Sequence, residues 1–204
     1  MSVAETAFPA LYKRELIDAI ERIPLDKVSE AIGWFRQARQ AGRTIFTCGN
    51  GGSASTASHF VCDIVKGASF QREERFRMMS LNDSLATLTA YSNDVAYEVA
   101  FVEQLKNFAQ RDDVVLAISG SGNSPNVVKA VEYANSIGCR TIALSGRDGG
   151  KLGAAAQLNI QVSVPHMGRI EDAHMIICHM IGYYFMEEGN AGPYQSAGGS
   201  GGKA

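Results

Sequence analysis

Apolar residues recur every three or four positions along the first forty residues of the chain. The pattern runs through "PALYKRELIDAIERI" (9–23) and "LDKVSEAIGWFRQARQAG" (25–42). This spacing places the apolar side chains on one face of a helix, and Gly42 at the end of the second segment is typical of a helix stop. We therefore predict that the chain begins with two amphipathic helices.

From residue 43 onward, short runs rich in β-branched and aliphatic residues alternate with longer helical patterns. We predict strands at 43–48, 76–81, 113–119, 140–145 and 158–164, helices at 53–68, 84–91, 95–109, 125–137 and 150–155, and a closing helix from about 169 to 188. Strands that alternate with helices form right-handed βαβ units and a parallel sheet covered on both faces. The pattern therefore predicts an α/β fold.

One domain accounts for this pattern. Residues 1–42 form N-terminal helices that belong to the same domain as the α/β segment 43–188. The last segment, 189–204, is "GNAGPYQSAGGSGGKA". It is rich in glycine and poor in apolar side chains, so we expect a disordered tail outside the fold.

The composition excludes several classes of partner. The 204 residues include 19 basic and 21 acidic side chains, a net charge of −2, with no excess of positive charge for nucleic acid. The longest apolar run (175–186) contains His179 and is too short to span a bilayer, and the start of the sequence lacks the apolar core of a signal peptide. Four cysteines without a CxxC pair indicate reduced thiols in a cytoplasmic protein. We expect neither a nucleic acid nor a membrane partner.

Two strand–loop–helix units resemble each other, "IFTCGNGGSAS" and "LAISGSGNSPN". Each loop follows the carboxyl end of a strand and opens onto a helix, where free backbone N–H groups and the helix dipole attract anions. The loops also carry hydroxyl groups that can donate to phosphate or sugar oxygens: Ser53, Ser55, Thr56, Ser119, Ser121 and Ser124. The alternative is that these serines only cap the helices.

Neither loop matches a nucleotide-binding motif. The first lacks the lysine of G-x-x-x-x-G-K-[ST] and also departs from G-x-G-x-x-G. We therefore expect no nucleotide cofactor. Two uncharged, hydroxyl-lined loops suit the single phosphate of a small phosphorylated sugar.

Histidines and carboxylates gather on two of the predicted helices. His59 and Asp63 are four residues apart and share a helix face, while Glu171, His174 and His179 lie on the last helix. Such a set is the inventory of an acid–base pair or of a divalent metal site. The alternative is that the histidines are hydrogen-bonded core residues, which we prefer for His174.

Five segments in this order resemble the sugar isomerase (SIS) family, and within it the phosphoheptose isomerases. They are "CGNGGS", "SNDVAYE", "ISGSGNSPNVVKA", "ALSGRDGGKL" and "RIEDAHMIICH", and the resemblance covers about residues 10–188. It implies a flavodoxin-like three-layer α/β/α sandwich with a five-stranded parallel sheet. It also implies a homotetramer in which the N-terminal helices pack for oligomerisation and the active sites lie between subunits.

The resemblance also implies roles for individual residues. The family's catalytic acid and histidine correspond to Asp63 and His179. In some members a zinc ion is held at the positions of His59, Asp63, Glu171 and His179. The substrate contacts fall on Asn50, Gly51, Gly52, Asn93, Asp94, Ser119, Gly120, Ser121 and Ser124, with Glu171 also near the substrate. From the residues alone, Asn93 and Asp94 read as an ordinary turn between two helices.

The chain departs from the family pattern at two of these positions. Asp63 replaces a glutamate and is one methylene shorter, while Glu171 replaces a glutamine and adds a negative charge. The implied activity is conversion of sedoheptulose 7-phosphate to D-glycero-D-manno-heptose 7-phosphate through an enediol, with Asp63 as base and His179 as acid, or the reverse. The alternative is a non-catalytic SIS module that binds a sugar phosphate or a partner protein, as in the bacterial replication-initiation regulators. Those relatives lack this acid and this second histidine.

Overall fold

The computed structural model describes residues 3–188 as one α/β unit built on a five-stranded parallel sheet, and the predicted tail 189–204 lies outside these described residues. The strands are β1 (Thr44–Gly49), β2 (Arg77–Ser80), β3 (Val114–Ser119), β4 (Arg140–Gly146) and β5 (Leu158–Val162). Their spatial order is β2-β1-β3-β4-β5, which is the flavodoxin-like order. The predicted fold class is confirmed, and each strand lies within two residues of its predicted bounds.

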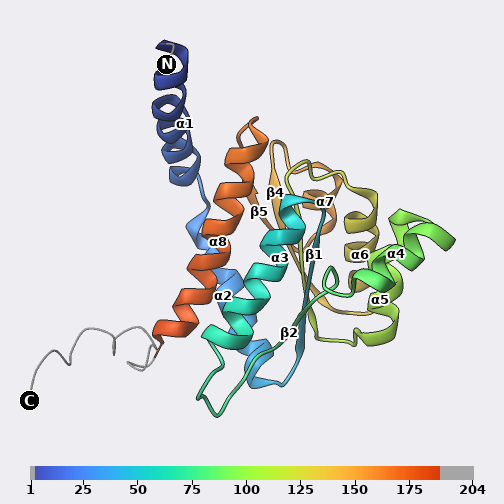
Figure 1. Cartoon of the computed structure of the whole chain (residues 1–204). Helices are drawn as coiled ribbons and strands as arrows, with labels where there is room; N and C mark the ends of the chain where they lie inside the picture. The colour runs from blue at the N-terminus through green and yellow to red at the C-terminus, as the bar shows by residue number, and fades with distance from the viewer. Residues whose placement is uncertain (1–2, 189–204) are drawn as a thin grey trace, which may run out of the picture.

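Helices cover both faces of the sheet (Figure 1). On one face lie α1 (Val3–Glu21), α2 (Leu25–Gln40), α3 (Gly52–Cys62) and α8 (Met167–Glu187), and on the other α4 (Leu85–Asp94), α5 (Ala100–Phe108), α6 (Pro125–Ser136) and α7 (Gly150–Ala155). Alternate residues of the central strands enter opposite cores. Val114 and Leu116 join the first and Val115 and Ala117 the second, so both faces of β3 are buried.

The first turns of α1 stand away from the sheet (Figure 1). Phe8 there is 57% exposed, and Ile17 in the later part of the helix is still 48% exposed, whereas Ala19 near the end of the helix is fully buried in the core. The role of this helix in oligomerisation stays a prediction. None of the helices between residues 3 and 188 combines the length and the apolar character that a membrane span requires.

Several helix bounds differ from the sequence prediction, and two of the differences involve candidate site residues. The predicted helix 53–68 changes at Asp63 into a π-helical turn, Asp63–Gly67. The predicted helix 84–91 continues to Asp94, so Asn93 and Asp94 are its last residues and not a turn between helices, which corrects that interpretation. The helix ends only where Val95 leaves the helical region, and a short 3₁₀ turn, Tyr97–Val99, then precedes α5.

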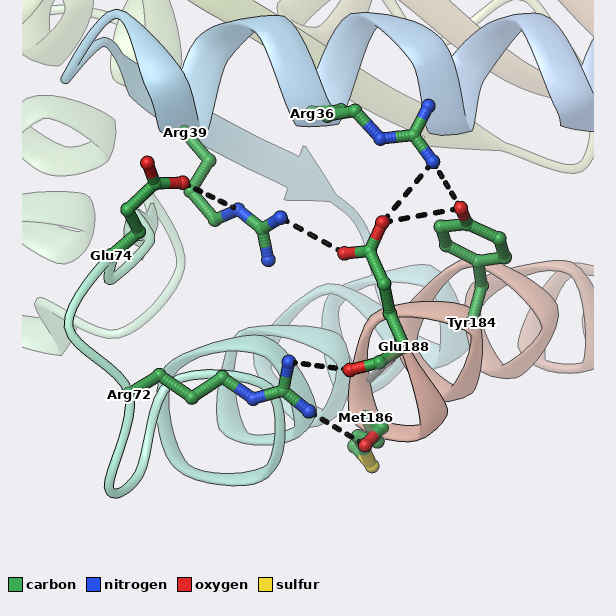
Figure 2. A network of polar contacts seen from close by, with 7 residues as sticks. All are labelled: Arg36, Arg39, Arg72, Glu74, Tyr184, Met186 and Glu188. Carbon is green, nitrogen blue, oxygen red and sulfur yellow. Dashed lines mark hydrogen bonds and ion pairs between the residues drawn. The ribbon is translucent and has the colours of Figure 1, made fainter. Parts of the chain in front are cut away.

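A network of arginines holds the end of α8 against α2 and the segment before β2 (Figure 2). Arg39 donates to one carboxylate oxygen of Glu188 at 2.9 Å, and Arg36 donates to the other at 3.3 Å. Arg72 donates to the backbone carbonyls of Met186 and Glu188 at 2.7 and 3.0 Å. The last carbonyls of a helix lack partners within the helix, so these bonds satisfy groups that would otherwise need water.

We expect Glu188→Gln to lower the free energy of unfolding by about 1 kcal/mol at pH 7, as for a partly exposed ion pair. Partial burial acts to raise the pKa of Glu188, but hydrogen bonds and charge from Arg39 and Arg36 outweigh it and hold the pKa below its ordinary value. A lowered carboxyl pKa contributes stability above the unfolded pKa, and this is lost as pH falls through the folded pKa. Denaturant titrations of both proteins should therefore differ at pH 7 and converge at acid pH. A gap that persists in acid would contradict this assignment.

Candidate active site

The loops after β1 and β3 leave the sheet side by side and line one cavity. Gly49 at the end of β1 pairs with Ile118 near the end of β3, so both strands deliver their loops to the same edge. The cavity has a volume of about 290 Å³. Its lining combines both loops with the start of α8: Asn50, Gly51, Gly52, Ser53, Ile118, Ser119, Gly120, Ser121, Ser124, Met167 and Glu171.

The serines of the second loop turn toward one another. The Ser119 hydroxyl oxygen lies 3.2 Å from that of Ser124 and 3.4 Å from that of Ser121. Ser124 is the N-cap residue of α6, yet its side chain makes no capping hydrogen bond. The N-cap of α3 is Gly51, which has no side chain to cap with. The interpretation of these serines as mere helix caps is therefore wrong.

Glu171 is the one charged side chain in the cavity lining, and it lies directly over Gly52. A Cβ atom on Gly52 would come within 2.6 Å of a Glu171 carboxylate oxygen, so a larger residue here would displace the Glu171 side chain. The cavity therefore combines an anion-attracting helix N-terminus and hydroxyl groups on one side with a carboxylate on the other. It suits a ligand that has both a phosphate and hydroxyl groups.

A second cluster lies farther along the same two helices. The Nε2 atoms of His59 and His179 are 3.1 Å apart, and the Oδ2 atom of Asp63 lies 3.3 and 3.6 Å from them. His59 lies seven residues beyond Gly52 and His179 eight beyond Glu171, which corresponds to about 10–12 Å of helix. Three of the four residues predicted to bind zinc are thus brought together, while Glu171 remains in the cavity and outside this group.

The cluster has the properties of a divalent metal site. Two Nε2 atoms that face each other at 3.1 Å cannot both carry a hydrogen, so at least one offers a lone pair. The Oδ2 atom of Asp63 is buried and makes no hydrogen bond with the described residues. Imidazole nitrogen and carboxylate oxygen are the ligands that such ions prefer, and three protein ligands leave a position open for substrate. The residues present therefore fit a metal ion.

The other histidine of α8 and the cysteines have structural positions. His174 is 1% exposed, and its Nε2 lies 3.0 Å from the backbone carbonyl of Ser145 at the end of β4, which confirms that it braces a neighbour. Cys48, Cys139 and Cys178 are buried, and burial raises the pKa of Cys48 to about 12 and that of Cys139 to about 11. Thiols with such pKa values stay protonated and unreactive at neutral pH.

Some predicted substrate contacts do not line the cavity. Ser55 is exposed on α3, and Asn93 and Asp94 are exposed at the end of α4, where they bond each other. Their contacts with substrate stay predictions. Sequence reasoning missed Met167, which lines the cavity, because a methionine at the start of an apolar helix gives no chemical signal.

Comparisons with known proteins give consistent matches in sequence and in fold. A family model described as the SIS domain matches residues 12–146. The chain is 41% identical over 142 residues to a probable phosphoheptose isomerase of Thermoplasma volcanium, covering 69% of this chain and 71% of that protein. It is 38% identical over 168 residues to a phosphoheptose isomerase of Citrifermentans bemidjiense, covering 82% of this chain and 86% of that protein. The solved phosphoheptose isomerase of Neisseria gonorrhoeae superposes with a TM-score of 0.82 at 30% identity, over 90% of this chain and 98% of that one.

The buried position of His174 makes the stability of the protein depend on pH. Burial lowers the pKa of His174 to about 4 from an ordinary value of 6.5 and outweighs the opposite effect of its bond to Ser145. Between these pH values the unfolded chain binds a proton that the folded chain excludes, so stability falls as pH drops from 6.5 toward 4, by up to about 3 kcal/mol. The variant His174→Gln lacks this proton. In denaturant titrations we expect His174→Gln to have a lower unfolding free energy than the wild-type protein at pH 7, and this difference should be smaller at pH 4.5. A difference that is the same at both pH values would refute the assignment.

Proposed function

The chain belongs to the SIS domain family and groups with its phosphoheptose isomerases, and from this membership we propose that it interconverts sedoheptulose 7-phosphate and D-glycero-D-manno-heptose 7-phosphate. The observation that carries the proposal is the convergence of His59, Asp63 and His179 on the same pair of helices that lines the hydroxyl-rich cavity. Phosphate binding alone would require the cavity. An isomerase also requires a pair of proton-transfer groups at some distance from the phosphate-binding cavity.

The phosphate group binds at the cavity end. Hydroxyl groups of Ser119, Ser121 and Ser124 donate to its oxygens at the start of α6, where the helix dipole also attracts an anion. The Glu171 carboxylate repels the phosphate, so it accepts hydrogen bonds from sugar hydroxyls and orients the carbon chain away from the serines. The open-chain sugar then extends along α3 and α8 toward the histidines. The predicted contacts of Ser53, Ser55, Asn93 and Asp94 belong to this same sugar chain.

The reacting carbons lie at the cluster end. The Asp63 carboxylate accepts the proton from the C1 carbon of the ketose, and the resulting enediol receives a proton at C2 to give the aldose. His179 transfers the accompanying proton between the two oxygens. The Asp63 side chain is 17% exposed, and its buried Oδ2 makes no hydrogen bond with the described residues, which leaves the carboxylate available as a base.

A zinc ion fits the same cluster, with His59, Asp63 and His179 as the residues that would hold it. When bound, such an ion would polarise the substrate carbonyl and stabilise negative charge on its oxygen. Glu171, the fourth ligand that the resemblance implies, lies over Gly52 and is not part of this group. We therefore assign it to the sugar and not to the metal.

The proposal includes a homotetramer in the cytoplasm. The side chains of His59 and His179 are 49% and 41% exposed in the single chain. This is more solvent exposure than suits a reaction that must exclude water. A neighbouring subunit over this surface would close the site. A reducing compartment agrees with four free cysteines and no disulfide among residues 3–188.

The variant Asp63→Asn keeps the shape of the side chain but removes the base. We expect kcat for sedoheptulose 7-phosphate to fall by about 100-fold or more, measured by coupled assay or NMR of the two sugars. Asp112→Asn is the matched control, because Asp112 is exposed at the opposite end of the sheet and its φ of 70° suits asparagine. A wild-type protein that is inert on this sugar and on a panel of ketose phosphates would refute the proposed function.

Removing one of the three serine hydroxyls proposed to bind the phosphate should weaken substrate binding without slowing the chemical step. For Ser124→Ala we expect KM to rise by about tenfold with kcat little changed, since the phosphate contact is the same in substrate and transition state. Inhibition by inorganic phosphate should weaken in parallel. Ser136→Ala, at the far end of the same helix, is the control. If Ser124→Ala and Ser136→Ala have the same KM, the phosphate does not bind at the serines of the cavity.

A further inference from the structure

The side-chain amide of Asn50 is held by residues from two other segments. Its Oδ1 accepts hydrogen bonds from the Tyr97 hydroxyl at 2.7 Å and from Nδ2 of Asn126 at 2.9 Å. Its Nδ2 donates to Oδ1 of Asn126 at 2.9 Å. Three of the segments that stand out in the sequence, "CGNGGS", "SNDVAYE" and "SGSGNSPN", therefore meet at one amide.

A backbone group fixes which way both amides point. The N–H of Val127 donates to Oδ1 of Asn126 at 3.0 Å, so this atom is the oxygen and not the nitrogen of the amide. Because Asn126 is oriented, the oxygen of Asn50 must face the nitrogen of Asn126, and the reverse. An amide flip at either residue would place two oxygens or two nitrogens in contact.

This arrangement leaves one donor free. An asparagine amide has two hydrogens, and the bond to Asn126 uses one of those on Asn50. Within residues 3–188 the second has no acceptor, and Asn50 lines the cavity that holds Gly52 and Ser119. With its oxygen fully occupied by two donors, Asn50 can act toward a ligand only as a hydrogen-bond donor.

We propose that Tyr97 and Asn126 are positioning residues that fix Asn50 as a hydrogen-bond donor to an oxygen of the bound sugar. This inference rests on the proposed function, since it names what the site does with its substrate. Neither Tyr97 nor Asn126 lines the cavity, so both act through Asn50. Asn126 is 1% exposed and belongs to the buried framework, whereas Tyr97 reaches over from the 3₁₀ turn between α4 and α5.

The position of Tyr97 indicates a functional contact. Its side chain is 49% exposed, so its ring adds little to the core, and its hydroxyl is nevertheless directed at Asn50. The turn that carries it is tied to α6 by an ion pair of Glu98 with Lys129 at 3.0 Å. Loss of the Tyr97 hydroxyl should therefore affect the ligand and leave the fold unchanged.

A double-mutant cycle separates positioning from a general structural role. For Tyr97→Phe we expect KM for sedoheptulose 7-phosphate to rise by about fivefold with kcat within about twofold, as for loss of one uniform binding contact. The same substitution in an Asn50→Ala background should change nothing further. Asn126→Asp, which cannot donate to Asn50, should raise KM at least as much as Tyr97→Phe. Thermal melting should be unchanged for Tyr97→Phe.

The control is Tyr133→Phe on α6, because the Tyr133 hydroxyl makes no hydrogen bond to any residue in the described part of the chain. The same cycle is measured on the dissociation constant of sedoheptulose 7-phosphate by calorimetry. Binding without turnover would refute the isomerase proposal and still decide this inference. The inference is overturned if Tyr97→Phe leaves KM and the dissociation constant unchanged, if its effect is equally large in Asn50→Ala, or if the sugar does not bind at all.

Discussion

The close parallel packing of α3 against α8 is the constraint on which the site depends. At one end Gly52 lies under Glu171, farther along His59 faces His179, and at the far end Gly182 lies against Asp63. From one contact to the next, the steps along the two segments differ by one residue, seven against eight and then four against three. A Cβ on Gly182 would meet that of Asp63 at 3.6 Å, so the helix backbones are already close there. Figure 1 shows α3 and α8 side by side on one face of the sheet. Because α8 is also fixed at its end by Arg39 and Arg72 (Figure 2), its side chains have a defined position relative to α3.

This packing accounts for the shorter acid at position 63. A glutamate there would extend the carboxylate by one methylene into imidazole nitrogens that already lie 3.3 and 3.6 Å away. A π-helical turn begins at Asp63, whose backbone stays in the right-handed helical region, and such turns are common at functional sites. Glu171 in place of glutamine is accommodated similarly, because Gly52 leaves room for a carboxylate inside the cavity.

Much of the fold follows from the sequence, and the reasons are local. Apolar runs such as 113–119 have no polar alternation because both faces of β3 are buried, and glycine and serine after β1 and β3 mark the loops that line the cavity. The pairing of His59 with Asp63 follows from helical periodicity. The remainder depends on tertiary contacts: the register of α3 and α8 separates Glu171 from the histidines, and the end of α4 beyond Asn93 is set where Val95 leaves the helix. The bond between Asn50 and Asn126 joins residues 76 positions apart, and no local pattern predicts it.

The central claim is that this pair of helices moves a proton between neighbouring carbons of a phosphorylated sugar. Turnover of sedoheptulose 7-phosphate in D₂O, followed by NMR of the aldose product, tests it most directly. The C1 proton passes through the Asp63 carboxylate, whose side chain is 17% exposed, so the account predicts solvent deuterium at C2 in part of the product and loss of both conversion and labelling in Asp63→Asn. Conversion by Asp63→Asn at the rate of the wild-type protein would contradict it.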